Sequence, residues 1–387
     1  MDTLERFAEA KLAALAERKL RRSLHETAPC GPVGVKRNGR ALISFCSNDY
    51  LNLSQHPAVK RAAVEATERW GAGAGASRLV TGNHPLFAAL ERRLARLKGT
   101  DDACVFGSGY LANLGIVPSL VGAGDLIVAD ELSHACLRAG ASLAHARVEI
   151  FRHNDLDHAE ALLAEHRAGH GRALLLTDGV FSMDGDLAPV AALAGIAAAH
   201  DTWLMTDDAH GIGVVGGGRG SSFVGGAKTE VPLQMGTLSK AVGSYGGYLC
   251  AAQPVIDLIR TRARPFIYST GLPPGVVAAS IAALDLIAND PDLVAAPLRK
   301  ASFFCARLNL PAPESCIVPI LLGAPERALA ASRLLEDEGV LVTAIRPPTV
   351  PEGTARLRLT FSAGHDDGDI ERLAEIVRAR ILDRDER

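Results

Sequence analysis

The sequence lacks the features that mark membrane, disulfide-rich and nucleic-acid-binding proteins. No apolar run approaches the roughly 20 residues that cross a bilayer. A net charge of −3 gives no general attraction to nucleic acid or anionic lipid. The seven scattered cysteines form no Cys-x-x-Cys pair, which fits reduced thiols and argues against zinc. We therefore expect no membrane, no nucleic acid and no metal as partners, and a cytoplasmic location.

Leader and nucleotide motifs are also missing. Leucines near the N-terminus recur at helical spacing among Glu5, Glu9 and Glu17, which predicts an amphipathic helix rather than a targeting leader. The glycines of residues 71–76 follow a helical pattern instead of a strand, and residues 213–220 have no acid about twenty positions later, so neither fits a dinucleotide motif. There is no Walker loop and no Gly-x-Ser-x-Gly elbow. A nicotinamide dehydrogenase and a serine hydrolase are therefore disfavoured.

The length and the order of the apolar segments predict two lobes. At 387 residues the chain exceeds the roughly 250–300 residues at which single cores stop growing. Short apolar runs alternate with helical patterns such as 85–97 and 189–200, which predicts an α/β fold with a largely parallel sheet covered on both faces. The predicted strands span residues 103–106, 125–129, 147–151, 173–177, 203–206, 233–236 and 247–252.

The pattern changes towards the C-terminus, where a smaller α+β lobe is predicted. Its strands are expected at residues 317–322, 340–345 and 356–361, and its helices at 326–338 and 366–382. The run Gly271–Gly275 is rich in residues that stop helices and marks the boundary. We therefore predict an N-terminal helix and arm (residues 1–45), a large domain (46–275) and a small C-terminal domain (276–387).

Two charged residues at predicted strand ends indicate the chemistry. Lys240 lies just beyond strand 233–236, and Asp207 follows strand 203–206. Parallel sheets bind ligands outside the carboxyl ends of their strands, where both residues fall. Pyridoxal phosphate chemistry requires such a pair, because the amine forms an imine with the aldehyde and the carboxylate keeps the ring nitrogen protonated. Each residue alone has an ordinary alternative, a solvated lysine and a helix N-cap.

A phosphate cradle is predicted where Gly107, Ser108, Gly109 and Tyr110 end one strand and open a helix. Accessible backbone N–H groups and the helix N-terminus favour an anion there. Thr237 precedes Lys240 in the chain and offers a hydroxyl near the same point. A structural turn is the alternative interpretation of these glycines.

Three further polar residues fall near the same edge of the sheet. His134 follows a strand and a short loop, and its flat ring suits one face of a pyridine, although a helix-capping or surface role is the alternative. His210 lies three residues beyond Asp207, so both can point into one crevice. Ser182 opens the run Ser182–Asp186, which is also typical of a simple turn.

A candidate carboxylate-binding site lies in the small lobe. Residues 354–360 have the pattern of a strand, and alternation puts Arg356 and Arg358 on one of its faces. A forked guanidinium is the natural partner of a substrate carboxylate. A surface ion pair is the alternative for these arginines.

Together these motifs resemble the α-oxoamine synthases, fold-type I pyridoxal phosphate enzymes that condense an amino acid with an acyl-CoA. The resemblance runs almost end to end, from Ser47–Leu51 to Thr354–Thr360, and rests on three runs in this order: Thr177–Asp186, Asp207–Gly211 and Thr237–Lys240. The run Ile345–Pro351 resembles the biotin-pathway branch, which uses L-alanine and a pimeloyl thioester, more than the glycine-, succinyl- and palmitoyl-using branches.

The resemblance implies a role for each candidate residue. The catalytic residues are Lys240, which holds the cofactor and acts as the base, His134, which stacks on the ring, and Asp207, which pairs with the ring nitrogen. Pyridoxal 5'-phosphate is expected to contact Gly109, Tyr110, His134, Ser182, Asp207, His210, Thr237 and Lys240. The substrates are expected to contact Arg21, Asn48, His134, Thr349 and Arg358. A homodimer is also implied, in which Ser269 and Thr270 reach the neighbour's phosphate.

Three positions depart from the usual residues of that family. Asp178 stands where glutamate is commoner, Asn52 replaces a glycine, and Ala76 occupies a place often held by glycine. None of these changes removes a group that the mechanism needs. The alternatives are another α-oxoamine synthase such as glycine C-acetyltransferase, an aminotransferase or threonine-aldolase-like lyase, and a non-catalytic partner subunit. The presence of Lys240 argues against the last.

Overall fold

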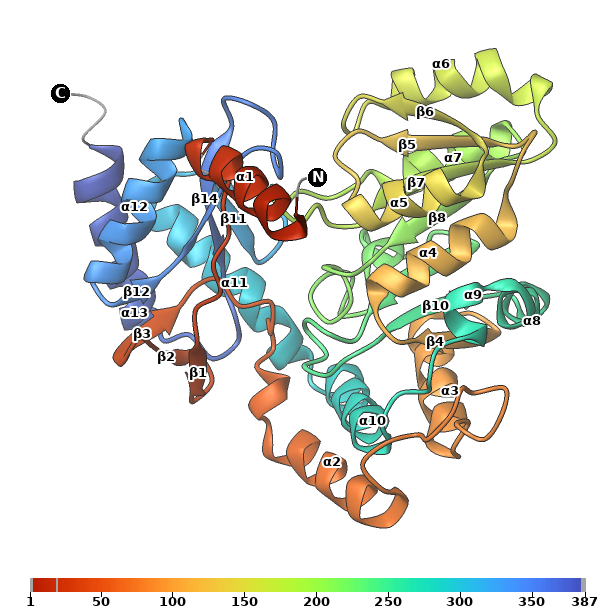
Figure 1. The fold of residues 1–387 in the computed structure, drawn as a ribbon, viewed down its shortest axis with the longest axis horizontal. Coiled ribbons are helices and arrows are strands. Elements are labelled where there is room, and N and C mark those ends of the chain that lie inside the picture. The colour runs from red at the N-terminus through yellow and green to blue at the C-terminus, as the bar shows by residue number, and fades with distance from the viewer. Residues whose placement is uncertain (1–2, 19, 384–387) are drawn as a thin grey trace.

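Two lobes lie side by side, and helix α11 (Pro291–Leu308) runs between them (Figure 1). The computed structural model describes residues 3–18 and 20–383. Within those residues, no helix combines the length and the apolar character that crossing a bilayer requires. The same residues contain no cluster of three or more His, Cys, Asp and Glu side chains that could bind a metal ion.

The large lobe is built on a seven-stranded sheet in the order β4-β10-β9-β8-β7-β5-β6. Its strands are β4 (Asp102–Phe106), β5 (Leu126–Asp130), β6 (Arg147–Phe151), β7 (Ala173–Asp178), β8 (Trp203–Asp207), β9 (Leu233–Thr237) and β10 (Gly247–Ala251). Strand β10 runs antiparallel to both of its neighbours, and all the other pairs are parallel. The predicted α/β class and mainly parallel sheet are confirmed, with each predicted strand within one residue of the observed bounds at either end.

Helices cover both faces of this sheet. Every residue of β5, β7, β9 and β10 is buried, so both faces of these strands must be covered. Alternate residues of β4 illustrate the two faces, because Cys104 packs in one core and Val105 in the other. One face carries α4 (Gly109–Leu120), α5 (Ala135–Ala144), α8 (Gln253–Arg262) and α9 (Arg264–Ile267). The other carries α2 (Pro57–Trp70), α3 (Leu86–Lys98), α6 (Leu156–His166), α7 (Val190–Ala199) and α10 (Pro274–Asn289). Short 3₁₀ turns occur at Leu53–Gln55, Arg167–Gly169 and Ser221–Phe223.

The small lobe contains two sheets and a separate core. One sheet has the antiparallel order β11-β14-β13, and the other has the order β1-β2-β3-β12. Phe45, Phe304 and Phe361 pack at the centre of the core. The strands are β1 (Thr27–Cys30), β2 (Gly34–Arg37), β3 (Arg40–Ser44), β11 (Ile317–Gly323), β12 (Val340–Leu341), β13 (Thr343–Ile345) and β14 (Ala355–Thr360). The helices are α11, α12 (Pro325–Asp337) and α13 (Asp367–Val377), which a π-helical turn (Arg378–Leu382) extends.

The single strand predicted at residues 340–345 is two strands. Strand β12 pairs in parallel with β3, whereas β13 pairs antiparallel with β14 in the other sheet. Val342 lies between them and is buried in the small-lobe core. A continuous apolar run contains no signal for a change of sheet, because the change depends on partners distant in sequence.

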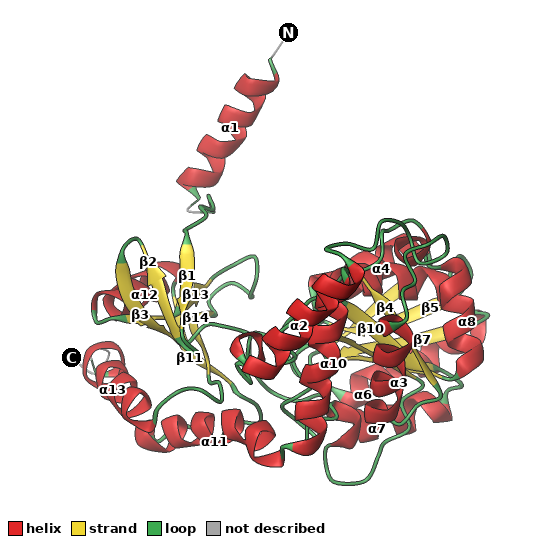
Figure 2. Ribbon diagram, turned by 90° about the horizontal axis from the view of Figure 1, so that it is seen from below, coloured by secondary structure: helices red, strands yellow, loops and turns green. Residues whose placement is uncertain are grey.

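Helix α1 (Leu4–Glu17) forms where an N-terminal helix is predicted, and Thr3 caps its first turn. It projects away from the rest of the chain (Figure 2), and none of its residues is buried. Its apolar side chains are therefore exposed to solvent, including Leu4, Phe7, Leu12 and Leu15.

The predicted division at residues 275 and 276 falls in the first turn of α10. The buried residues of α10 belong to the core that it shares with α2 and α3 of the large lobe. The arm at residues 1–45 ends in the β1-β2-β3 sheet, which joins the small lobe through β12. We propose that the boundary between the lobes lies at Asp290, between α10 and α11.

Candidate active site

The carboxyl ends of strands in the large sheet surround a cavity of about 190 Å³. Asp178 ends β7, Asp207 ends β8, and Lys240 follows β9 by three residues. His134 comes from the loop after β5, and α4 begins just after β4. Seven residues predicted to bind the cofactor line this one cavity: Gly109, Tyr110, His134, Asp207, His210, Thr237 and Lys240.

Lys240 is held in a chain of polar contacts. Its Nζ lies 2.7 Å from His210 Nε2, and His210 Nδ1 lies 2.6 Å from Tyr50 Oη. Burial lowers the pKa of Lys240 below its usual 10.5, and the carboxylate of Asp207 offsets part of that effect. Burial and the Lys240 cation lower the pKa of His210 well below its usual value, so this imidazole is neutral. The site therefore contains an amine that loses its proton more readily than a solvated lysine.

Asp207 accepts hydrogen bonds at both carboxylate oxygens, and Cys136 Sγ also lies 4.0 Å from Oδ2. Its Oδ1 accepts from the backbone N–H of Ala209 at 2.9 Å, and its Oδ2 accepts from Asn113 Nδ2 at 2.8 Å. The side chain is 4% exposed. A carboxylate with this orientation can accept a further hydrogen bond from a donor in the cavity, such as the N–H of a pyridinium ring.

His134 lies at the start of α5 beside Asp178 and Cys136. Its Nδ1 accepts from the backbone N–H of Cys136 at 3.2 Å and lies 2.7 Å from Cys136 Sγ. Its backbone N–H donates to Asp178 Oδ1 at 3.4 Å. Burial lowers the pKa of His134, so the ring that lines the cavity is neutral.

The N-terminus of α4 provides an anion site on the opposite wall. Ser108 caps the helix by accepting from Leu111 N–H at 3.1 Å. The backbone N–H groups of Gly109 and Tyr110 have no acceptor among the described residues and lie in the cavity wall. A Cβ at Gly109 would come within 3.3 Å of Thr237 Cβ. A larger residue would therefore crowd the space between the N-terminus of α4 and the Thr237 hydroxyl. The arrangement fits a phosphate group.

Arg358 of β14 joins the two lobes at the site. Its Nη2 donates to Tyr50 Oη at 3.2 Å and its Nη1 donates to Asn48 Oδ1 at 3.3 Å, while Nε donates to the carbonyl of Ser182. The residue is 6% exposed. Arg356, on the same face, instead pairs with the Asp184 carboxylate. Of the two arginines, Arg358 is therefore the one connected to the chain of contacts around Lys240.

Seven predicted residues do not line the cavity: Asn48, Ser182 and Arg358 belong to the hydrogen-bonded group described above, and Arg21, Thr349, Ser269 and Thr270 lie elsewhere. Arg21 is exposed in the segment after α1, and Thr349 is exposed in the loop between β13 and β14. Ser269 and Thr270 lie in the segment between α9 and α10, where Thr270 makes a β-bridge with Ser77. Within this single chain, these four side chains are not brought together with Lys240.

Of the three residues that depart from the family pattern, Asn52 has a local explanation, and nothing in the structure explains Ala76. Asn52 adopts a left-handed backbone conformation with φ of 54°, which glycine favours and asparagine tolerates. Its amide also bonds the carbonyl of Pro32 at 2.8 Å and the N–H of Gly364 at 2.6 Å. Burial and the neighbouring Asp207 raise the pKa of Asp178 well above its usual value, so this carboxyl is protonated.

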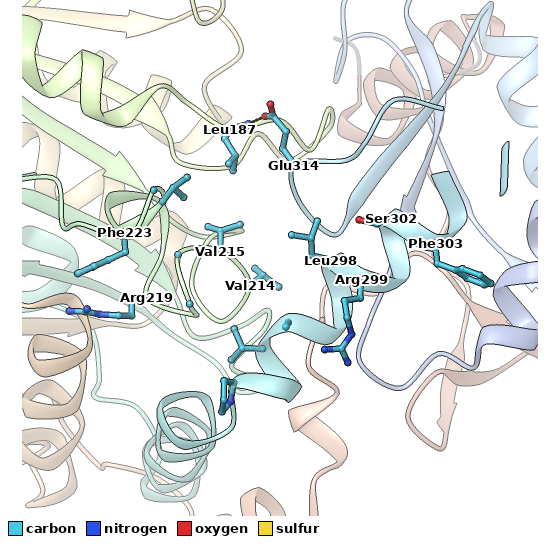
Figure 3. A pocket seen from close by; sticks show the side chains of 18 residues that line it. Leu187, Val214, Val215, Arg219, Phe223, Leu298, Arg299, Ser302, Phe303 and Glu314 are labelled. Atoms are coloured by element: carbon cyan, nitrogen blue, oxygen red, sulfur yellow. Dashed lines mark hydrogen bonds between the residues drawn. The ribbon is translucent and has the colours of Figure 1, made fainter. Parts of the chain in front are cut away.

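A larger cavity of about 1160 Å³ lies between the lobes and shares no lining residue with the strand-end cavity (Figure 3). Val214, Val215 and Leu298 give it mainly apolar walls. Its polar residues are partly engaged by the chain itself, because Arg219 donates to the Leu97 carbonyl and Glu314 accepts from Leu187 N–H. The strand-end cavity is the one with the titratable groups that chemistry requires.

Two residues of the site were not predicted from the sequence. Asn113 contacts Asp207, and Cys136 lies between His134 and Asp207. A single amide within the apolar run of α4 is the one signal that could have identified Asn113. Tyr50 lies in a run that carries the family resemblance, but its contact with His210 joins residues 160 positions apart.

Comparisons with known proteins agree with this geometry. The model of the family "Aminotransferase class I and II" matches residues 40–377. A protein of Methylocella silvestris named 8-amino-7-oxononanoate synthase is 66% identical over 344 residues, covering 89% of this chain and 98% of that protein. A protein of the same name from Beijerinckia indica is 60% identical over 377 residues, covering 97% and 98%.

Among solved structures, serine palmitoyltransferase from S. paucimobilis, with bound PLP–myriocin aldimine, superposes with a TM-score of 0.91 at 28% identity, covering 98% of each chain. The matches span nearly the whole chain and include both lobes. The chain therefore belongs to the aminotransferase class I and II family, and within it to the group of 8-amino-7-oxononanoate synthases.

Proposed function

We propose that this chain uses pyridoxal 5'-phosphate to condense L-alanine with a pimeloyl thioester, on coenzyme A or a carrier protein, in biotin synthesis. The products are 8-amino-7-oxononanoate, the free thiol and carbon dioxide. The observation that carries the proposal is the cavity in which Lys240, Asp207, His134 and the N-terminus of α4 converge. The two relatives named 8-amino-7-oxononanoate synthase that are described above are 66% and 60% identical to the chain.

The residues of the cavity fit the cofactor group by group. When bound, pyridoxal phosphate supplies an aldehyde that joins amines covalently and a protonated ring that withdraws electrons from the α-carbon. Gly109, Tyr110 and Thr237 would hold the phosphate, and Asp207 would hold the ring nitrogen. His134 would cover one face of the ring, and Lys240 would supply the amine that attaches the aldehyde.

Lys240 also moves the α-proton of alanine. An amine must be unprotonated to act as a base, and a solvated lysine is almost entirely protonated at neutral pH. Burial of Lys240 lowers its pKa and so enlarges the neutral fraction. Lys240 removes the proton from the α-carbon before the bond to the acyl carbon forms, and a proton returns to that carbon after carbon dioxide leaves.

Arg358 and Asn48 orient the amino-acid substrate. The guanidinium is held by Tyr50 and the Ser182 carbonyl, so its geometry is set before the substrate arrives. A forked cation in this position binds the alanine carboxylate. We propose that Arg21 and Thr349 line the path of the acyl chain outside the cavity.

The chain is proposed to act as a cytoplasmic homodimer. The exposed apolar face of α1 and the half-exposed Tyr110 at the cavity wall support a second chain covering this side. In such a dimer Ser269 and Thr270 reach the partner's phosphate site. All seven cysteines are among the described residues and are free thiols, which supports a reducing compartment.

A panel of substrates tests the reaction. The protein loaded with pyridoxal phosphate is incubated with L-alanine, glycine or L-serine and with pimeloyl-, acetyl- or palmitoyl-CoA, while thiol release is followed and the product is identified by mass spectrometry. We expect the fastest release with L-alanine and pimeloyl-CoA. Preference for glycine with acetyl-CoA would assign the chain to glycine C-acetyltransferase instead. Amino transfer or aldol cleavage without thiol release would refute the synthase.

A further inference from the structure

Asn113 is a buried amide whose place in an apolar helix needs an explanation. It lies on α4 and is completely buried. Its Nδ2 donates to Asp207 Oδ2 at 2.8 Å and to Cys136 Sγ at 3.0 Å, whereas its Oδ1 accepts no hydrogen bond within the described part of the chain. A buried polar atom without a partner is costly, so a purely structural role would favour an apolar residue here.

Cys136 continues the contact from Asn113 to His134. The thiol sulfur lies 2.7 Å from His134 Nδ1, and the backbone N–H of Cys136 donates to the same nitrogen at 3.2 Å. Because a backbone N–H can only donate, Nδ1 is an acceptor and neutral His134 carries its proton on Nε2. Burial raises the pKa of Cys136 to about 12, which keeps the thiol protonated and able to donate to Nδ1.

We propose that Asn113 is a positioning residue that sets the orientation of Asp207 directly and that of His134 through Cys136. The inference rests on the proposed function, in which these two side chains contact the ring of pyridoxal phosphate. Ala209 N–H and the Asn113 amide hold one carboxylate oxygen each, so the two bonds define the plane of the carboxylate. Without the amide, the carboxylate keeps the bond from Ala209 N–H at Oδ1, but only the 4.0 Å contact from Cys136 Sγ remains at Oδ2, so its plane is less well fixed.

The first test replaces Asn113 by leucine, which has a similar volume and no donor. Titration of the cofactor-free protein with pyridoxal phosphate gives the dissociation constant, and 15N NMR of labelled cofactor follows protonation of the ring nitrogen with pH. Loss of a hydrogen bond to a charged group predicts roughly ten- to hundredfold weaker binding. We also expect the ring nitrogen to lose its proton at lower pH than in the unaltered protein.

Ser119→Ala is the matched control on the same helix. Ser119 is buried, and its hydroxyl donates to the Gly115 carbonyl at 2.6 Å without contacting the cavity. This variant is expected to keep the affinity and the nitrogen titration of the unaltered protein. An Asn113→Leu protein that also keeps the unaltered nitrogen titration would overturn the proposal, because the amide would then only fill space.

A pair of Cys136 variants tests the second contact, and decides the proposal if Asn113→Leu fails to fold. Cys136→Ser retains a group that donates to His134 Nδ1 and accepts from Asn113, so it should keep the nitrogen titration. Cys136→Val removes that group and should shift the titration in the same direction as Asn113→Leu. If the ring nitrogen titrates identically in the two variants, the contact from Asn113 to His134 through Cys136 is refuted. The cofactor affinity and the titration of the ring nitrogen can both be measured without an acyl substrate. A protein that binds the cofactor but does not catalyse the condensation would therefore contradict the proposed function and leave the role of Asn113 intact.

Discussion

Lys98→Met should destabilise the large lobe strongly, although Lys98 lies outside the cavity. Its ammonium lies 2.6 Å from Asp208 Oδ2 and 2.6 Å from the Arg219 carbonyl oxygen, and both side chains of the ion pair are fully buried. Methionine keeps the aliphatic chain but leaves the carboxylate without its cation. Removal of one partner from a buried pair costs about 3–5 kcal/mol. Because Ser221 N–H still donates to Asp208 Oδ1 at 2.9 Å, we expect about 3 kcal/mol, the lower end of that range.

The assay is urea unfolding followed by tryptophan fluorescence, since both tryptophans, Trp70 and Trp203, lie in the large lobe. Arg93→Met is the matched control, because Arg93 lies on the same helix and pairs with Asp285 at 2.7 Å with both side chains at least a third exposed. An exposed pair contributes at most about 1 kcal/mol. Equal unfolding free energies for the two variants would refute the reasoning. Adding Asp208→Asn to Lys98→Met should recover stability, because it removes the unpaired charge.

Four further predictions concern the cavity. Lys240→Ala should lower turnover by at least roughly 10²–10⁴-fold, and borohydride should no longer fix the cofactor to the chain; a variant that still traps cofactor would contradict the assignment. Asp207→Asn should bind pyridoxal phosphate yet slow exchange of the alanine α-proton in D₂O by roughly ten- to hundredfold or more, so near-normal exchange by NMR would mean that Asp207 is only structural. Arg358→Lys should raise the KM for L-alanine about tenfold or more with a smaller change in kcat, since lysine cannot bind a carboxylate in the forked manner, and an unchanged KM would exclude Arg358 as the carboxylate partner. The rate at which the cofactor-free protein takes up pyridoxal phosphate should rise with pH, because only the neutral amine of Lys240 reacts with the aldehyde. Burial lowers the pKa of Lys240, so the rate should level off below pH 10.5, and a midpoint at or above 10.5 would refute this prediction.

The large lobe could be predicted from the sequence because most of its strands, such as β5, β7, β9 and β10, are buried on both faces. Such strands are short, continuous apolar runs, and each is separated from the next by a helical pattern. The rule that ligands bind at the carboxyl ends of parallel strands then brought Lys240 and Asp207 to one edge, and both line the cavity there. The class of the sheet and the core of the candidate site therefore follow from local patterns.

Contacts between distant segments could not be predicted in this way. The split of residues 340–345 into two strands depends on pairing with β3 and β14, which no local pattern encodes. Asn113 reaches Asp207 across 94 positions, and its only sequence signal is a polar residue in an apolar helix. The burial of Arg358 likewise depends on Tyr50 and Asn48, which lie more than 300 positions away.

The charge in the cavity is concentrated on one carboxylate. Asp178 and Asp207 are register partners at the ends of β7 and β8, so two carboxyl groups lie side by side in a buried place. Both cannot ionise there without strong repulsion, and the raised pKa of Asp178 means that Asp178 keeps its proton. Asn113 Nδ2 and Ala209 N–H each donate a hydrogen bond to the carboxylate of Asp207. Asp207 is therefore the carboxylate whose two oxygens are fixed towards a ring nitrogen, while the raised pKa of Asp178 favours a protonated side chain that can donate a hydrogen bond.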